Sequence, residues 1–220
     1  MAKAPKGILG PVTGSIGNLT FYELNGQAVL RRKSTYSSKP TEARLRARSA
    51  MRVLMNLFTR IKPFLRVGFI NHSRGTKRSY YNAAMSYNLR HGLKLELGGY
   101  KINFESLKLS TGNAEAVDRA IVERVAEGLA FNWQMKAGLD WESQNDQVMM
   151  MAYFPTENEA IFELHGARRS TRKDVLIIPP SLRSKAMEVY ISFVSSDRLR
   201  VAESFYLGRL NEPGDIITGT

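Results

Sequence analysis

Lysine and arginine are concentrated in the front part of this chain. Residues 1–98 contain 18 of them against three acids, a net charge of +15, whereas residues 99–220 contain 14 against 17, a net charge of −3. Such an asymmetry indicates that the leading part contacts something anionic. The change of sign also predicts two domains, residues 1–98 and residues 99–220.

The residue types that catalysis needs are scarce. The chain has no cysteine, which excludes disulfides, thiol catalysis and cysteine-based zinc sites. Its three histidines, His72, His91 and His165, are far apart and none has metal-ligand spacing to another. No Gly-x-Ser-x-Gly motif is present. We therefore expect a protein that is not an enzyme and that uses no cofactor and no metal.

Nothing in the sequence indicates a membrane protein. The N-terminus has no apolar run of signal-peptide type, and no stretch of about 18 apolar residues occurs anywhere. These features predict a protein that stays in the cytoplasm of the producing cell or is incorporated into a virion.

A β-hairpin is predicted near the N-terminus. Residues 19–24 and 27–32 are β-prone runs separated by Asn25-Gly26, a dipeptide that favours a two-residue turn. The four glycines of residues 7–17 do not form a phosphate-binding loop and are interpreted as an arm. Both faces of the hairpin carry apolar groups, so we expect it to pack against another subunit through Leu19, Phe21, Tyr22 and Leu24.

A long amphipathic helix is expected over residues 42–65, with Thr41 as its N-cap and a kink at Pro63. Its predicted apolar stripe consists of residues at spacings of three and four, namely Met51, Leu54, Met55, Phe58, Ile61 and Leu65. Residues 68–77 look like a loop, and a second helix is predicted over residues 79–90. Together with the hairpin, these helices would form the first domain.

Basic residues near this helix are the candidates for contact with a polyanion or a partner. They are Arg31, Arg32, Lys33, Arg44, Arg48, Arg52, Arg74, Lys77 and Arg78. Arg44, Arg48 and Arg52 share one side of the helix because they are spaced by four residues. Tyrosines interleave with the basic residues, an arrangement that suits nucleic acid but is commoner in packing. A merely solvated face is the simpler interpretation, and both stay open.

The second domain is predicted to be an immunoglobulin-like antiparallel β-sandwich, which makes the chain α+β. Short strand-like runs recur at intervals of about ten residues. They cover residues 100–104, 107–109, 129–133, 148–154, 160–164, 175–178, 187–194 and 204–210. Residues 117–126 suit either a helix or a strand, and a strand is preferred because the neighbouring segments are strands. We expect Trp133 and Trp141 to anchor the core or its rim; as an alternative, Trp133, Trp141 and Tyr153 would serve as carbohydrate platforms.

Several separated blocks resemble one protein family. They are Gly7–Gly10, Gly14–Asn18, Arg31-Arg32, Lys39–Glu42, Tyr81–Asn88, Val189–Phe193 and Ser204–Gly208. This family comes from the Bacteroidota and their mobile elements and is catalogued as a domain of unknown function. The resemblance covers nearly the whole chain and implies neither an activity nor a catalytic residue. The Pro-Thr-Glu helix start with its arginine-rich helix is also similar to phage structural proteins.

These observations lead to two expectations about function. The first is a structural or assembly protein, such as a phage virion component, that docks to copies of itself or to other structural subunits through its basic front half. The second is a cytoplasmic protein that binds nucleic acid without sequence specificity.

Overall fold

The computed structural model of the chain describes residues 12–24, 26–33, 39–73 and 78–211. It confirms the predicted α+β class. The residues form two compact units that divide between Leu45 and Arg46, and not near residue 98, where the charge changes sign. None of the helices in the described part is long and apolar enough to cross a membrane.

The first unit contains a three-stranded antiparallel sheet in the order β1-β2-β3. Its strands are β1 (Gly14–Ile16), β2 (Leu19–Leu24) and β3 (Gln27–Arg32). The predicted hairpin is confirmed, with Gly26 at φ +77°, whereas Asn25 lies outside the described residues. The sequence did not predict β1, because its glycines were interpreted as an arm. Gly17, at φ +53°, instead makes the tight turn into β2.

Four helices follow among the described residues, and the first of them begins in the last residues of the first unit and continues into the second. They are α1 (Glu42–Arg60), α2 (Lys62–Gly68), α3 (Ile70–Ser73) and α4 (Tyr80–His91). The predicted break near Pro63 is confirmed, because α1 ends one residue before Ile61 and α2 has Pro63 in its first turn. The second helix begins as predicted, with the Ser79 side chain accepting a hydrogen bond from the Asn82 N–H. The short α3 occupies part of the expected loop.

The buried face of α1 differs from the predicted stripe. Leu54, Phe58, Ile61 and Leu65 are buried as expected, but Met51 and Met55 are 44% and 45% exposed. Their places in the core are taken by Ala50 and Leu57. The buried stripe is therefore rotated, and two methionines lie on the solvent side among the arginines.

A hairpin of β4 (Leu93–Glu96) and β5 (Gly99–Ile102) follows α4, and seven strands come after it. These strands are β6 (Ala120–Val125), β7 (Gly128–Trp133), β8 (Gln147–Phe154), β9 (Glu159–Glu163), β10 (Lys173–Ile177), β11 (Met187–Val194) and β12 (Phe205–Leu210). They form two antiparallel sheets in the orders β10-β7-β6 and β12-β11-β8-β9. A constant-type immunoglobulin domain has the same orders except that the fourth strand, here β9, belongs to the other sheet.

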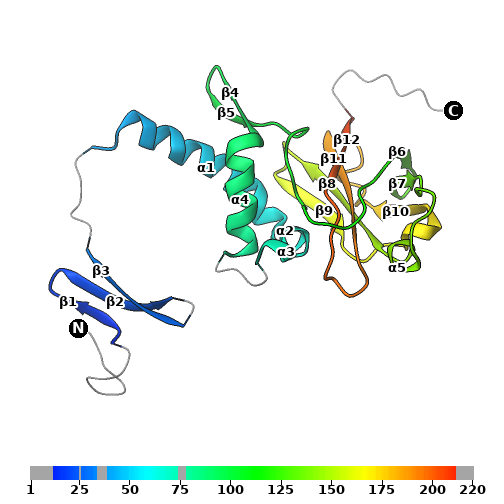
Figure 1. Cartoon of the computed structure of the whole chain (residues 1–220). Helices are drawn as coiled ribbons and strands as arrows, with labels where there is room; N and C mark the ends of the chain where they lie inside the picture. Colours follow the sequence, from blue (N-terminus) through cyan, green and yellow to red (C-terminus); the bar gives the residue numbers. More distant parts are fainter. Residues whose placement is uncertain (1–11, 25, 34–38, 74–77, 212–220) are drawn as a thin grey trace. The chain divides into compact units, whose positions relative to one another are not determined.

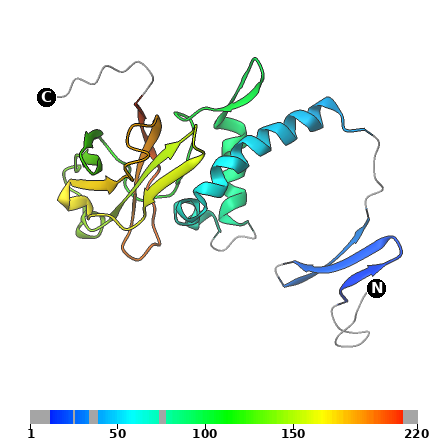
Figure 2. The same cartoon turned by 180° about the vertical axis from the view of Figure 1, so that it is seen from behind.

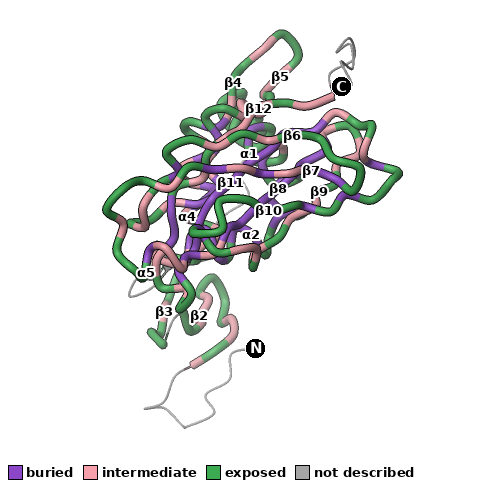
Figure 3. The backbone as a smooth tube through the Cα atoms, turned by 90° about the vertical axis from the view of Figure 1, so that its right-hand side faces the viewer, coloured by how far each residue is buried: buried purple, intermediate pink, exposed green. Residues whose placement is uncertain are grey.

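Three layers are visible in the second unit (Figures 1 and 2): the helices, the four-stranded sheet and the three-stranded sheet. Strands β8 and β11 are buried on both faces (Figure 3). Because successive side chains of a strand point to opposite faces, Met149 and Met151 belong to the core shared with the helices, and Met150 belongs to the core between the sheets. The helices and the sandwich therefore share one folded unit.

Residues 107–109 do not form the predicted strand. Leu107 and Leu109 are buried in the core shared with the helices. The Lys108 N–H donates to Asn88 Oδ1 at 2.9 Å and the Leu109 N–H donates to Ser204 Oγ at 2.9 Å. Side chains thus satisfy the backbone of a segment whose alternating pattern is typical of a strand.

A buried cluster connects the two sheets where an immunoglobulin domain has its disulfide. Trp133 on β7 makes an edge contact with Phe193 on β11, with ring centroids 5.4 Å apart. The Arg169 guanidinium lies 3.8 Å above the Phe193 ring and pairs with Asp146 at 3.5 Å. The Trp133 indole N–H donates to the Arg169 carbonyl. Aromatic and charged groups therefore occupy the place of that disulfide in this cysteine-free sandwich.

Candidate functional site

The N-terminal sheet presents an apolar face, which we define as Ile16, Leu19, Phe21 and Leu30. These residues share a face because Leu19 is opposite Ile16, and Phe21 is opposite Leu30. Ile16 is 59% exposed and Leu30 is 55% exposed. None of the described residues from 12 to 45 is buried. The described residues of the first unit therefore leave this apolar face exposed or only half-buried.

The predicted interface residues divide between the two faces of the sheet. Leu19 and Phe21 belong to the apolar face, whereas Tyr22 and Leu24 lie on the opposite face. There the Arg31 guanidinium lies 5.9 Å from the centre of the Tyr22 ring. Sequence reasoning missed Ile16 and Leu30. The two-residue hairpin turn already sets Leu30 opposite Phe21, but β1 had to be recognised before Ile16 could be assigned to a face.

The basic residues predicted to contact a polyanion occur in two groups. Arg31, Arg32 and Lys33 lie exposed at the end of β3. The Lys33 N–H donates to the Asn18 carbonyl at 2.8 Å and extends the sheet by one residue. Arg31 and Arg32 point to opposite faces of the strand.

The second group lies on α1. Arg44, Arg48 and Arg52 are exposed, and no ion pair between described residues involves them. The exposed Met51 and Met55 share this side of the helix, which combines flexible apolar side chains with fixed positive charges. This surface can accept an anionic partner that also offers apolar contacts.

The remaining basic residues predicted from the sequence give less support for contact with a polyanion. Arg74 and Lys77 lie outside the described residues. Arg78 is exposed just before the N-cap of α4 and already has an interaction within the chain. Of the tyrosines interleaved with them, Tyr81 packs edge-on against Phe58 with centroids 6.0 Å apart. That contact assigns Tyr81 to packing.

Acidic side chains are exposed on the edges of the sandwich. Glu123 lies on the edge strand β6, Glu127 follows it, and Glu159 lies on the edge strand β9. Within the described ranges these three carboxylates make no ion pair. No group of three His, Asp or Glu side chains among the described residues could hold a metal ion.

Comparison with known proteins gives a family without an assigned activity. A family model described as "Family of unknown function (DUF6266)" matches residues 11–208. No curated protein and no solved structure matches the chain.

Proposed function

Because the chain belongs to the Family of unknown function (DUF6266), which brings no activity with it, we propose a function from the surfaces alone: a non-enzymatic structural subunit that assembles with copies of itself. The apolar face of the N-terminal sheet docks on a neighbouring copy, and the basic residues beside it strengthen that contact. A phage-type particle, encoded by a mobile element of the Bacteroidota, is the setting we propose.

The observation that carries this proposal is the uncovered apolar face. A three-stranded sheet needs a hydrophobic face packed against something before it is stable in water. Burial of Phe21 and of Leu30 would each contribute about 1.5–3 kcal/mol. The described part of residues 12–45 buries neither of them. A sheet of this kind is stabilised by the surface on which it docks.

The distribution of charge favours another copy of the chain as the partner on which the N-terminal sheet docks. Arg31, Arg32 and Lys33 border the sheet, and the sandwich exposes unpaired carboxylates on its edge strands. Opposite charges of this kind steer two proteins together and fix how they dock. A head-to-tail contact between a basic front and an acidic rear repeats from copy to copy, as a particle or a filament requires.

The assembly state of the purified chain tests this proposal. We expect sedimentation equilibrium to show a discrete oligomer at micromolar concentration that dissociates on dilution. Raised salt should weaken the oligomer because exposed ion pairs are screened. A chain that remains monomeric at every concentration would exclude the proposal.

Binding to nucleic acid is the second candidate function, and the free arginine row of α1 favours it. Phosphate contacts release counterions, so affinity falls steeply as salt rises. We expect the triple variant Arg44→Ala, Arg48→Ala and Arg52→Ala to reduce the slope of log K against log salt by about 2 to 3 on a mixed-sequence DNA duplex.

The control for this experiment removes three exposed cations of the sandwich instead, Arg119, Arg168 and Lys173. Its slope should equal that of the unchanged chain. Fluorescence anisotropy with labelled duplex measures both variants. An affinity for DNA that does not change with salt concentration would exclude a nucleic-acid role for α1. Equal slopes for the two triple variants would exclude it as well.

A further inference from the structure

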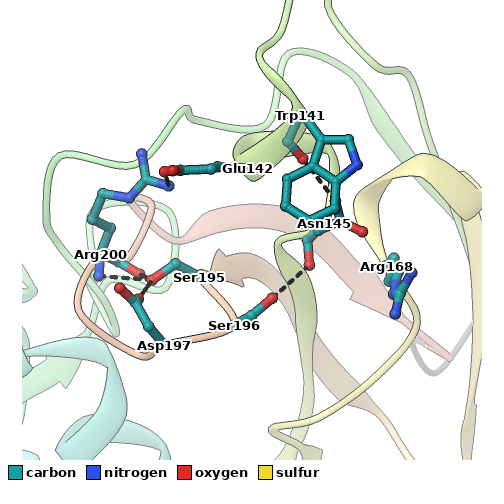
Figure 4. A pocket seen from close by; sticks show the side chains of 8 residues that line it. All are labelled: Trp141, Glu142, Asn145, Arg168, Ser195, Ser196, Asp197 and Arg200. Atoms are coloured by element: carbon teal, nitrogen blue, oxygen red, sulfur yellow. Dashed lines mark hydrogen bonds and ion pairs between the residues drawn. The ribbon is translucent and has the colours of Figure 1, made fainter.

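Three loops meet at one end of the sandwich and line a cavity of about 310 Å³ (Figure 4). The β7–β8 connection contains α5 (Trp141–Gln144) and supplies Trp141, Glu142 and Asn145. The β9–β10 connection supplies Arg168, and residues 195–200 come from the β11–β12 connection. In immunoglobulin folds, loops at one end of the sandwich form the binding surface of variable domains. The volume lies at the lower end of the range for small-ligand pockets.

Trp141 is the most unusual residue of this cavity. Its side chain is 77% exposed, although the sequence predicted a tryptophan in the core or at its rim. Figure 4 shows its indole between the Glu142–Arg200 ion pair and Arg168. Tryptophan is enriched, with tyrosine and arginine, among the interface residues that contribute most to binding. The exposed indole ring of Trp141 is therefore accessible to a ligand.

The loops around Trp141 are held in place before any ligand arrives. The Asp140 side chain accepts a hydrogen bond from the Ser143 N–H and caps α5. The Asn145 amide donates to the Trp141 carbonyl at 2.8 Å, and Ser196 Oγ donates to the Asn145 carbonyl at 3.1 Å. The last of these bonds connects two loops that are about fifty residues apart in the sequence. A fixed site loses less conformational entropy when it binds.

The charges of the cavity indicate what kind of ligand fits. Arg168 and Arg200 are balanced by Glu142 and Asp197, and Arg200 donates to Glu142 at 3.1 Å. At Arg200, a phosphate or another anion would have to compete with that carboxylate. The lining offers donors and acceptors side by side, as a ligand with many hydroxyl groups requires. C–H groups with partial positive charge pack well on the negative face of an indole.

We propose that this cavity binds a neutral sugar ring of a glycan, with the ring stacked on Trp141 and its hydroxyls hydrogen-bonded by the charged side chains around it. Arg168 has no side-chain partner among the described residues, so its guanidinium is available to a ligand hydroxyl. This role is independent of assembly through the N-terminal sheet.

A glycan microarray tests the proposal. The array carries neutral hexoses, N-acetylhexosamines, deoxyhexoses and bacterial polysaccharides, and the labelled full chain is applied to it. We expect retention of at least one glycan, and at least about a tenfold loss of affinity for that glycan in Trp141→Ala. Arg168→Ala should also weaken retention, whereas Leu97→Ala, a fully exposed apolar side chain in the β4–β5 turn, should not.

Fluorescence supplies a second readout. The chain has only two tryptophans, and Trp133 is 4% exposed. Acrylamide therefore quenches mainly Trp141, and the retained glycan should protect it from quenching. All variants should keep the oligomeric state of the unchanged chain. No glycan retained, equal retention by Trp141→Ala, or protection by a peptide library instead of a glycan would overturn the proposal.

Discussion

Replacing Arg169 with alanine should lower the free energy of unfolding by about 3–5 kcal/mol. The Arg169 side chain is almost fully buried, and its guanidinium pairs with Asp146 and donates to the Glu115 carbonyl at 2.7 Å. The same group covers the Phe193 ring. The variant leaves a buried carboxylate without its cation, and Asp146 Oδ1 already lacks a hydrogen-bond partner among the described residues. Urea denaturation followed by circular dichroism measures the loss.

The adjacent residue provides the matched control. Arg168 is exposed, so Arg168→Ala should change stability by no more than about 0.5 kcal/mol. If Arg169→Ala does not fold, the double variant Asp146→Ala with Arg169→Ala keeps the prediction testable. It removes both charges and should be more stable than Arg169→Ala alone. Equal effects of the two single arginine variants would contradict the buried pair.

The pH dependence of this loss has a definite sign. Burial raises the pKa of Asp146 above its ordinary value, and Arg169 opposes that rise. Without Arg169, the pKa of Asp146 in the folded protein rises further above its value in the unfolded chain. Between these two pKa values, the folded state binds more protons than the unfolded state. Stability then falls as pH rises through that interval. The deficit of Arg169→Ala should therefore be smaller at acidic pH than at neutral pH.

The double variant Phe21→Glu with Leu30→Lys should convert the assembled protein into a monomer. These two residues are directly opposite on β2 and β3, so the new side chains can form a cross-strand ion pair that preserves the sheet. Loss of both apolar side chains reduces the free energy of association by about 3–6 kcal/mol, which raises the dissociation constant 100-fold or more. Sedimentation velocity at matched concentrations measures the change.

The opposite face of the same sheet supplies the control. Tyr22 and Val29 are also directly opposite each other, so Tyr22→Glu with Val29→Lys introduces the same charges on the other side. This variant should keep most of the assembly. Identical behaviour of the two variants would show that docking does not depend on the apolar face defined by Ile16, Leu19, Phe21 and Leu30.

Local patterns in the sequence were sufficient for most of the fold. Most strands of the sandwich follow from short strand-like runs that recur at intervals of about ten residues. The break at Pro63 follows from the chemistry of a single residue. These features depend on neighbours only a few positions apart, which is why one sequence reveals them.

Features that depend on distant neighbours were not predictable. Met51 and Met55 fit an apolar stripe along α1. However, the side of α1 that is buried is decided by its packing in the core shared with α4 and the four-stranded sheet. Residues 107–109 alternate like a strand, yet Asn88 and Ser204 take their backbone hydrogen bonds. The cavity beside Trp141 combines three loops, and no local spacing indicates that they meet.

Crosslinking of an isotopically mixed sample tests most directly whether the N-terminal sheet docks on another copy. Chains with natural nitrogen and chains labelled with ¹⁵N are mixed, dissociated, reassembled and treated with a lysine-specific crosslinker, and Lys33 reports on the end of β3. The proposed docking predicts mixed-isotope peptides that join Lys33 of one copy to a lysine of residues 46–220 of another. Lys33 crosslinks that contain a single isotope throughout would contradict it.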